Sequence, residues 1–149
     1  MSDSIGRLRW AVKESFIDYV RGLSDGTIET FNGCEAEDGI FVFAGESAGD
    51  GVLSFAGGIQ FTGFAGMLDV RLVDPMIEGD GVDKTLTALV GPKSIAARAA
   101  IATIEGAEPL RAGETWTGHP RLTFEGVRIF GDVYEVGTEL APLVFEPGQ

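Results

Sequence analysis

The sequence predicts a mostly β fold, an antiparallel two-sheet sandwich or barrel-like domain with an N-terminal amphipathic helix and one short C-terminal helix. Two observations lead to this prediction. From about residue 40 onward, apolar and polar residues alternate in short runs, as they do in strands that bury one face. The chain also contains 22 glycines, many of them between these runs, where tight turns need a permissive backbone.

The first element is predicted to be a helix over residues 8–23. Seven residues at helical spacing fall on one side, and most of them are apolar: Leu8, Val12, Ser15, Phe16, Tyr19, Val20 and Leu23. Charged side chains occupy most of the other side. Gly22 and the Ser-Asp-Gly turn at residues 24–26 are typical of a helix end.

The periodicity then changes from near 3.6 to 2. Alternating runs predict strands at residues 40–44, 52–55, 59–61, 67–73 and 85–90. Residues 92–106 fit two interpretations, because residues 96–100 favour a helix by propensity whereas alternate residues from 95 to 103 form one face of a strand. Since both neighbouring segments resemble strands, we favour a strand.

Residues 122–130 predict the second, short helix. Thr123 would be its N-cap, Val127 and Phe130 would pack inward, and Gly131 would end it. A last strand is expected at residues 143–146. We find no repeat, low-complexity segment or linker, and therefore expect residues 1–149 to form a single domain.

Composition excludes several classes of partner. A net charge of −12 repels phosphate backbones and anionic lipid heads, so we expect neither nucleic acid nor a membrane as partner. The only cysteine, Cys34, cannot form an internal disulfide. The first residues lack the basic and apolar regions of a signal peptide, which favours the cytoplasm, although an exported protein that had lost its leader would look the same. The sequence leaves a homodimer open.

Standard catalytic signatures are missing. There is no Walker loop and no GxSxG motif, and one histidine with one cysteine cannot build the usual zinc sites. His119 lies in a predicted exposed turn, and Glu14 and Asp18 lie on the polar face of the first helix, where solvated charges are expected. We therefore assign no catalytic residue and expect a binding protein, while an enzyme stays open.

Ser15 and Tyr19 are four residues apart, so both point the same way from adjacent turns of the first predicted helix. They border its apolar side and would face the sheet or a pocket beside it. Taken alone, the pair also fits ordinary packing of a tyrosine whose hydroxyl stays in water.

A resemblance gives these residues a specific meaning. The segment LRWAVKESFIDYV at residues 8–20 resembles the opening motif of the HtaA domain family, whose members bind haem in actinobacterial haem-uptake proteins. Three later segments resemble the family in the same order, so the match spans most of the chain. They are residues 55–69, which contain FTG and GML, Asp74 with Pro75, and GDVYEVGTELAP at residues 131–142.

The resemblance implies a β-rich double-sheet fold and a haem whose iron is held by a helix tyrosine, which falls on Tyr19. It also implies that Ser15 lies near the haem. A free phenol has a pKa of about 10, but ferric iron is a hard Lewis acid that favours the deprotonated oxygen. The resemblance therefore implies a module for transport or storage of ferric haem.

The chain departs from the family pattern at one position. The family has a histidine in a Phe-x-Gly-His-x-Gly turn that hydrogen-bonds the ligating tyrosine, whereas residues 61–66 read FTGFAG and place Phe64 there. Phenylalanine can neither donate nor accept that bond. Loss of such a partner typically costs about 10–100-fold in metal affinity or activity.

Two interpretations remain. In the first, haem binds through Tyr19 beside Phe16, Phe64 stacks on the porphyrin, and the propionates meet Ser15 and one of three basic residues, namely Arg9, Lys13 and Arg71. In the second, the scaffold takes another small molecule, as a binding protein or a biosynthetic enzyme. Its apolar pocket would then be lined by five aromatic residues: Trp10, Phe16, Phe55, Phe61 and Phe64.

Overall fold

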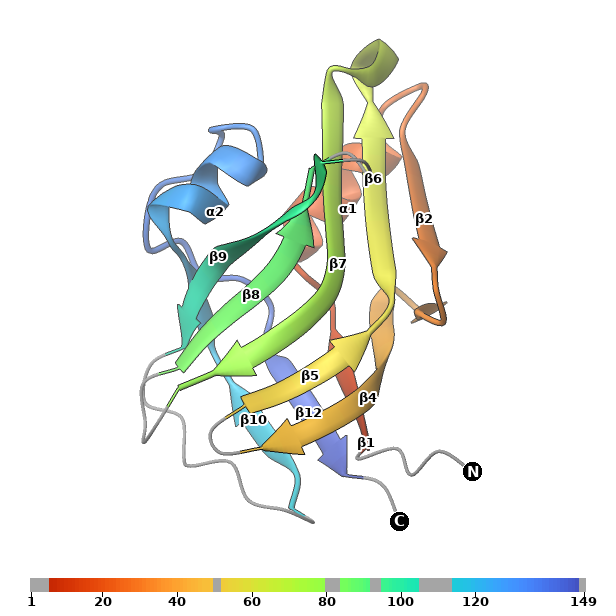
Figure 1. The fold of residues 1–149 in the computed structure, drawn as a ribbon. Coiled ribbons are helices and arrows are strands. Elements are labelled where there is room, and N and C mark those ends of the chain that lie inside the picture. Colours follow the sequence, from red (N-terminus) through yellow and green to blue (C-terminus); the bar gives the residue numbers. More distant parts are fainter. Residues whose placement is uncertain (1–5, 50–51, 80–83, 92–94, 105–113, 148–149) are drawn as a thin grey trace.

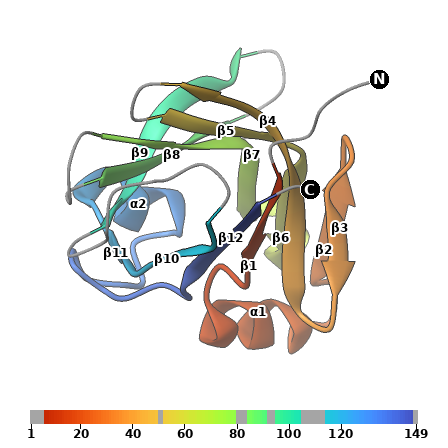
Figure 2. The same cartoon turned by 90° about the horizontal axis from the view of Figure 1, so that it is seen from below.

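The computed structural model describes residues 6–49, 52–79, 84–91, 95–104 and 114–147, and it confirms the mostly β fold with two helices. Within these residues, twelve strands form one antiparallel sheet that curls into a nearly closed barrel (Figures 1 and 2). The strands are β1 (Gly6–Trp10), β2 (Thr27–Phe31), β3 (Glu35–Glu37), β4 (Ile40–Gly49), β5 (Val52–Ala56), β6 (Gly58–Gly63), β7 (Leu68–Glu78), β8 (Lys84–Val90), β9 (Ala97–Ile104), β10 (Trp116–Gly118), β11 (Pro120–Leu122) and β12 (Leu143–Pro147).

Helix α1 (Glu14–Arg21) follows β1, helix α2 (Phe124–Ile129) follows β11, and the short 3-10 turn η1 (Phe64–Gly66) joins β6 to β7. The order of strands along the main path is β10-β12-β1-β4-β5-β7-β8-β9-β11. Strand β1 therefore lies between β12 and β4, and Gly6 is opposite Pro147. No helix in the described part of the chain is long and apolar enough to cross a membrane.

Strand β7 belongs to two parts of the sheet. Its first half pairs with β6, and its second half pairs with β5 and β8 after a break in register between Val73 and Met76. At this corner Gly57 donates its backbone N–H to the carboxylate of Asp74. As a result β2, β6 and the first half of β7 extend beyond the rest of the barrel and carry η1 at their tip, near α1 (Figure 1).

The prediction of a helix over residues 8–23 was wrong in its first third. Residues 6–10 form β1, in which Leu8 and Trp10 are buried. The chain then breaks at Val12, whose φ is +57°, and the helix begins only at Glu14. Apolar residues at every second position fit either period over so short a stretch. Residues 6–10 form a strand because they pair with β12 on one side and with β4 on the other.

The other predicted elements are confirmed. Each predicted strand has its counterpart, including β9 in the segment that fitted either a strand or a helix. Residues 92–94 and 105–106 of that segment lie outside the described residues. The Thr123 hydroxyl caps α2 by accepting a hydrogen bond from the Gly126 N–H at 2.9 Å. Strands β2, β3, β10 and β11 were not predicted.

A single core of buried side chains fills the barrel. Phe41, Phe61, Phe16 and Phe130 form a chain of edge-to-face ring contacts, with centroids 5.0 to 5.9 Å apart. This chain joins the strands to both helices. Cys34 is also buried, which raises the pKa of its thiol to about 12, so the thiol stays protonated at neutral pH.

Candidate functional site

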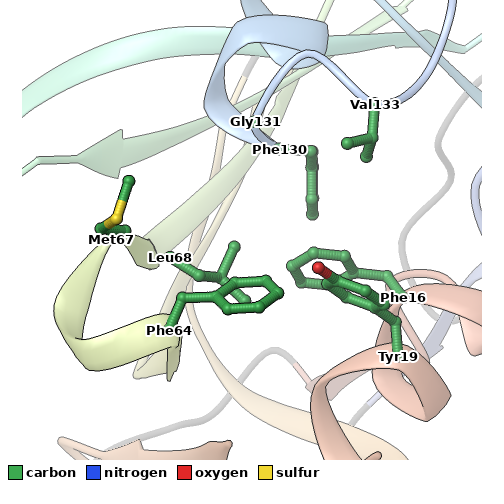
Figure 3. Close-up of a pocket in the computed structure, with 8 residues that line it drawn as sticks. All are labelled: Phe16, Tyr19, Phe64, Met67, Leu68, Phe130, Gly131 and Val133. Carbon is green, nitrogen blue, oxygen red and sulfur yellow. The ribbon is translucent and has the colours of Figure 1, made fainter. Parts of the chain in front are cut away.

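An apolar pocket of about 460 Å³ lies where α1, the β6–β7 turn and the C-terminal end of α2 meet (Figure 3). These three parts are far apart in the sequence, and the bend of β7 helps to bring them together. Eight residues line the pocket: Phe16, Tyr19, Phe64, Met67, Leu68, Phe130, Gly131 and Val133.

Phe16 and Phe130 are pocket residues that belong to the packed core. Each is 1% exposed, and their rings meet edge to face at a centroid distance of 5.0 Å. Phe61 packs against Phe16 from behind, also at 5.0 Å. Because close packing holds these rings in place, this wall of the pocket is preformed.

Tyr19 gives the pocket its polar group. It lies on α1, its side chain is 46% exposed, and its hydroxyl points away from the helix into the pocket (Figure 3). Among the eight lining residues it alone carries a side-chain oxygen or nitrogen. The phenol is therefore neither sealed off by packed neighbours nor directed away from the pocket.

Phe64 faces Tyr19 from the β6–β7 turn, with 6.1 Å between ring centroids and an interplanar angle of 51°. It is 50% exposed, as expected for a residue in a hairpin turn. Both Phe64 and Ala65 have positive φ angles, +50° and +54°. Their backbone N–H groups donate to the carboxylate of Asp25, and the Ala65 bond above all lowers the pKa of that carboxyl.

The mouth of the pocket is apolar as well. Met67 is 91% exposed, and Val133 is also largely exposed. Sequence analysis did not single out Met67, Leu68, Gly131 or Val133 as pocket residues, and it assigned Phe130 only to packing. Apolar residues in turns beside the two motifs of the resemblance, FTGFAG and GDVY, were the only signal that could have found them.

The structure brings three of the four expected ligand-binding residues together, because Tyr19, Phe16 and Phe64 all line the pocket. Ser15 is exposed on α1, one turn before Tyr19, and is not among the lining residues.

The five-residue aromatic pocket of the alternative interpretation was wrong in part. Trp10, Phe55 and Phe61 are buried in the core and do not line the pocket. The alternation of apolar residues indicates burial, but it does not distinguish a side chain packed in the core from one that faces a cavity.

The three basic residues considered for an anionic group differ in their surroundings. Arg9 forms an ion pair with Glu37, and Arg71 stacks over the ring of Phe31 at 4.5 Å. Strand alternation places Arg71 on the opposite face of β7 from the pocket residue Leu68.

Lys13 alone of the three is connected to the pocket wall. Its Nζ donates to the Glu139 carbonyl oxygen at 3.0 Å and lies 5.4 Å from the ring centroid of Tyr134, which packs against Phe130.

A smaller pocket of about 270 Å³ involves other residues of α1, including Glu14 and Asp18, which are exposed as predicted. His119 is exposed between β10 and β11, also as predicted. The described residues contain no group of three or more histidine, cysteine, aspartate or glutamate side chains placed to hold a metal ion.

The family model and the similar solved structures all point to the same family. The family model described as Htaa matches residues 5–146. The structure of the haem-binding protein HtaB from Corynebacterium glutamicum is similar with a TM-score of 0.81 and 25% identity, covering 95% of this chain and 91% of that chain. The C-terminal domain of HtaA from the same organism gives a TM-score of 0.77 and 27% identity, covering 95% and 96%.

A domain-swapped dimer of a variant of that HtaA domain is also similar, with a TM-score of 0.65, 26% identity and coverage of 89% and 88%. No curated protein sequence matches the chain significantly.

Proposed function

The chain belongs to the HtaA family, and from that premise we propose that it binds ferric haem in the pocket between α1, η1 and α2, with the Tyr19 phenolate as iron ligand. One observation carries the proposal. A half-exposed phenol, which is the single side-chain oxygen among the lining residues, points into an otherwise apolar pocket. Similarity to a haem-binding protein supports the choice of ligand.

The chemistry of the lining residues fits this ligand. A porphyrin ring is flat and apolar, and the side chains of Phe16, Leu68 and Phe130 offer it a dry surface. A phenolate is a hard anionic donor that suits ferric iron, and tyrosine ligates haem in other proteins. Because a phenolate disfavours ferrous iron, reduction would favour release, which suits a carrier or store of the ferric form.

Phe64 would take the place next to Tyr19 where a hydrogen-bonding partner is expected from the family pattern. It cannot stabilise the phenolate, but its half-exposed ring can stack on the porphyrin. We therefore expect binding to depend more on apolar contact and less on a tuned iron ligand.

The propionates would lie at the mouth of the pocket, where charged groups keep their contact with water. Ser15 lies one turn from Tyr19 on the exposed surface of α1 and can donate its hydroxyl. Lys13 can supply a positive charge if its Nζ exchanges the Glu139 carbonyl for a propionate.

The experiment is a titration of the purified protein with haemin, followed by absorbance. We expect a Soret band with a weak charge-transfer band, as for a tyrosine-ligated ferric haem. Tyr19→Phe should abolish the charge-transfer band and weaken binding. The chain offers a matched control, because Tyr134 is its only other tyrosine and does not line the pocket. Tyr134→Phe should bind haemin as the wild type does.

Protoporphyrin IX without iron separates the pocket from the ligand bond. It should bind the wild type and Tyr19→Phe equally well, because it offers no iron to the phenol. No spectral change at micromolar haemin would contradict haem binding, and an unchanged haemin spectrum of Tyr19→Phe would contradict the assignment of the ligand.

A further inference from the structure

The turn after α1 is hydrogen-bonded to the turn that carries Phe64 through one carboxylate, that of Asp25. Asp25 Oδ1 accepts a hydrogen bond from the Phe64 N–H at 3.1 Å, and Oδ2 accepts one from the Ala65 N–H at 2.7 Å. Asp25 lies four residues beyond the end of α1, the helix that carries Tyr19. One side chain thus joins the two walls of the pocket.

The conformation of the η1 turn needs such support. Phe64 and Ala65 are consecutive residues with φ near +50°, a region that residues other than glycine adopt rarely. In this conformation both backbone N–H groups point to the same place, and a carboxylate with two acceptor oxygens matches them. The negative charge also strengthens both bonds.

The two turns are in close contact beside this carboxylate. A Cβ atom added at Gly63 would lie 2.6 Å from Leu23 Cδ1 and 3.7 Å from the Cα atom of Gly26. The base of the β6–β7 turn is therefore packed against the turn after α1. Asp25 adds two hydrogen bonds to the next residues of the β6–β7 turn, Phe64 and Ala65.

We propose that Asp25 is a positioning residue that holds Phe64 opposite Tyr19 and thereby keeps a ligand in the pocket. Asp25 does not line the pocket and acts only through the turn. Without its carboxylate the turn relaxes, Phe64 leaves the position facing Tyr19, and the mouth opens. The ligand then dissociates faster, while the bond to Tyr19 is unchanged. The part of the inference that concerns the ligand rests on the proposed function.

The first test measures haem dissociation into an excess of a haem-scavenging protein. We expect Asp25→Asn and Asp25→Ala to raise the dissociation rate about tenfold, the lower range for loss of a residue that orients a ligand-contacting group. The Soret and charge-transfer bands should keep their positions. Asp69→Asn is the matched control, because Asp69 is exposed on β7 and its carboxylate accepts only from the Gln60 side chain among the contacts described.

A double-mutant cycle tests whether Asp25 acts through Phe64. Phe64→Ala should also speed dissociation, and adding Asp25→Ala to it should change the rate no further. Additive effects would overturn the proposal, because Asp25 would then act by another route. If Asp25→Ala fails to fold, the same cycle can be run with Asp25→Asn, which keeps the shape of the side chain.

A second measurement needs no ligand. Hydrogen exchange of the Phe64 and Ala65 amides, followed by NMR, should be faster in Asp25→Asn than in the wild type or in Asp69→Asn. If the wild type does not bind haemin, the proposed function fails, and amide exchange alone decides whether Asp25 holds the turn. Unchanged exchange would overturn the inference, and so would released amides with an unchanged dissociation rate.

Discussion

At position 64 the chain places an aromatic ring where the family pattern expects an imidazole, and this ring lies 6.1 Å from that of Tyr19. A hydrogen bond to a phenolate favours its charged form and lowers the pKa of the tyrosine. Phenylalanine offers none, so in the proposed site no side chain at position 64 would support Tyr19 as an iron ligand. We therefore expect the residue at position 64 to change the affinity of the proposed site for haem.

Phe64→His should restore the missing bond. If Tyr19 is the iron ligand as proposed, we expect haemin to bind about 10–100-fold more tightly, because the imidazole can hydrogen-bond the phenolate oxygen. Competition for haemin between the variant and the wild type measures the change. Phe124→His is a suitable control, since Phe124 is also an exposed phenylalanine but lies on α2 and does not line the pocket. Equal or weaker binding by Phe64→His would show that position 64 does not face the iron ligand.

Only those residues of the candidate site that lie in recognisable sequence motifs could be predicted from the sequence. Tyr19, Phe16 and Phe64 lie in segments that resemble the family, and all three line the pocket. Phe130 was expected to be buried but not to border a cavity. Val133 follows α2 in a loop, where no periodicity applies. The pocket is formed between elements that are far apart in the sequence, and a pattern within one element cannot reveal it.

At the scale of elements, the two helices differ in how their starts are specified. The start of α2 is set by a local side-chain cap, because the Thr123 hydroxyl accepts a hydrogen bond from the Gly126 N–H. The start of α1 is set by the tertiary fold, because the Lys13 side chain at the N-cap forms no capping hydrogen bond and the residues before it are held in β1. The first kind of signal is visible in the sequence, whereas the second depends on strands more than 30 residues away.

Replacement of Thr123 tests the contribution of the N-cap of α2 to stability. Thr123 Oγ1 accepts from Gly126 and also donates to the Ala100 carbonyl at 2.6 Å, which ties α2 to β9. We expect Thr123→Ala to lower the free energy of unfolding by about 1–2 kcal/mol. Urea denaturation measures the loss. Thr117→Ala, at an exposed position of β10, should stay within about 0.5 kcal/mol of the wild type.

At the scale of the whole molecule, the order of strands could not be predicted although most strands were. Alternation shows which face of a strand is buried, but it does not identify the neighbour on either side. Pairing of β1 with β12 joins residues 139 positions apart, such as Arg7 and Glu146, whose side chains also form an ion pair. The barrel is therefore completed only when its last strand is in place.

Removal of residues 143–149 should abolish the monomeric fold. Loss of β12 leaves β1 and β10 without a shared neighbour and uncovers buried side chains such as Leu8 and Trp116. Exposed edges and apolar surface favour aggregation or exchange of strands between chains. Size-exclusion chromatography and circular dichroism measure the outcome, with removal of residues 148–149 alone as control. A truncated chain that remained a folded monomer would show that β12 is dispensable.

Size-exclusion chromatography of the intact chain also tests the homodimer, which stays a prediction.

The register of Gly6 with Pro147 means that the polypeptide enters and leaves the barrel at one spot. Since β1 runs from that spot toward α1, the two ends of the barrel's chain lie at the end of β1 that is remote from the helix bearing Tyr19. Because its two ends lie together, a domain of this shape can be repeated in tandem along one polypeptide or inserted into a surface loop of another domain. In either arrangement each unit would keep its own pocket open to solvent.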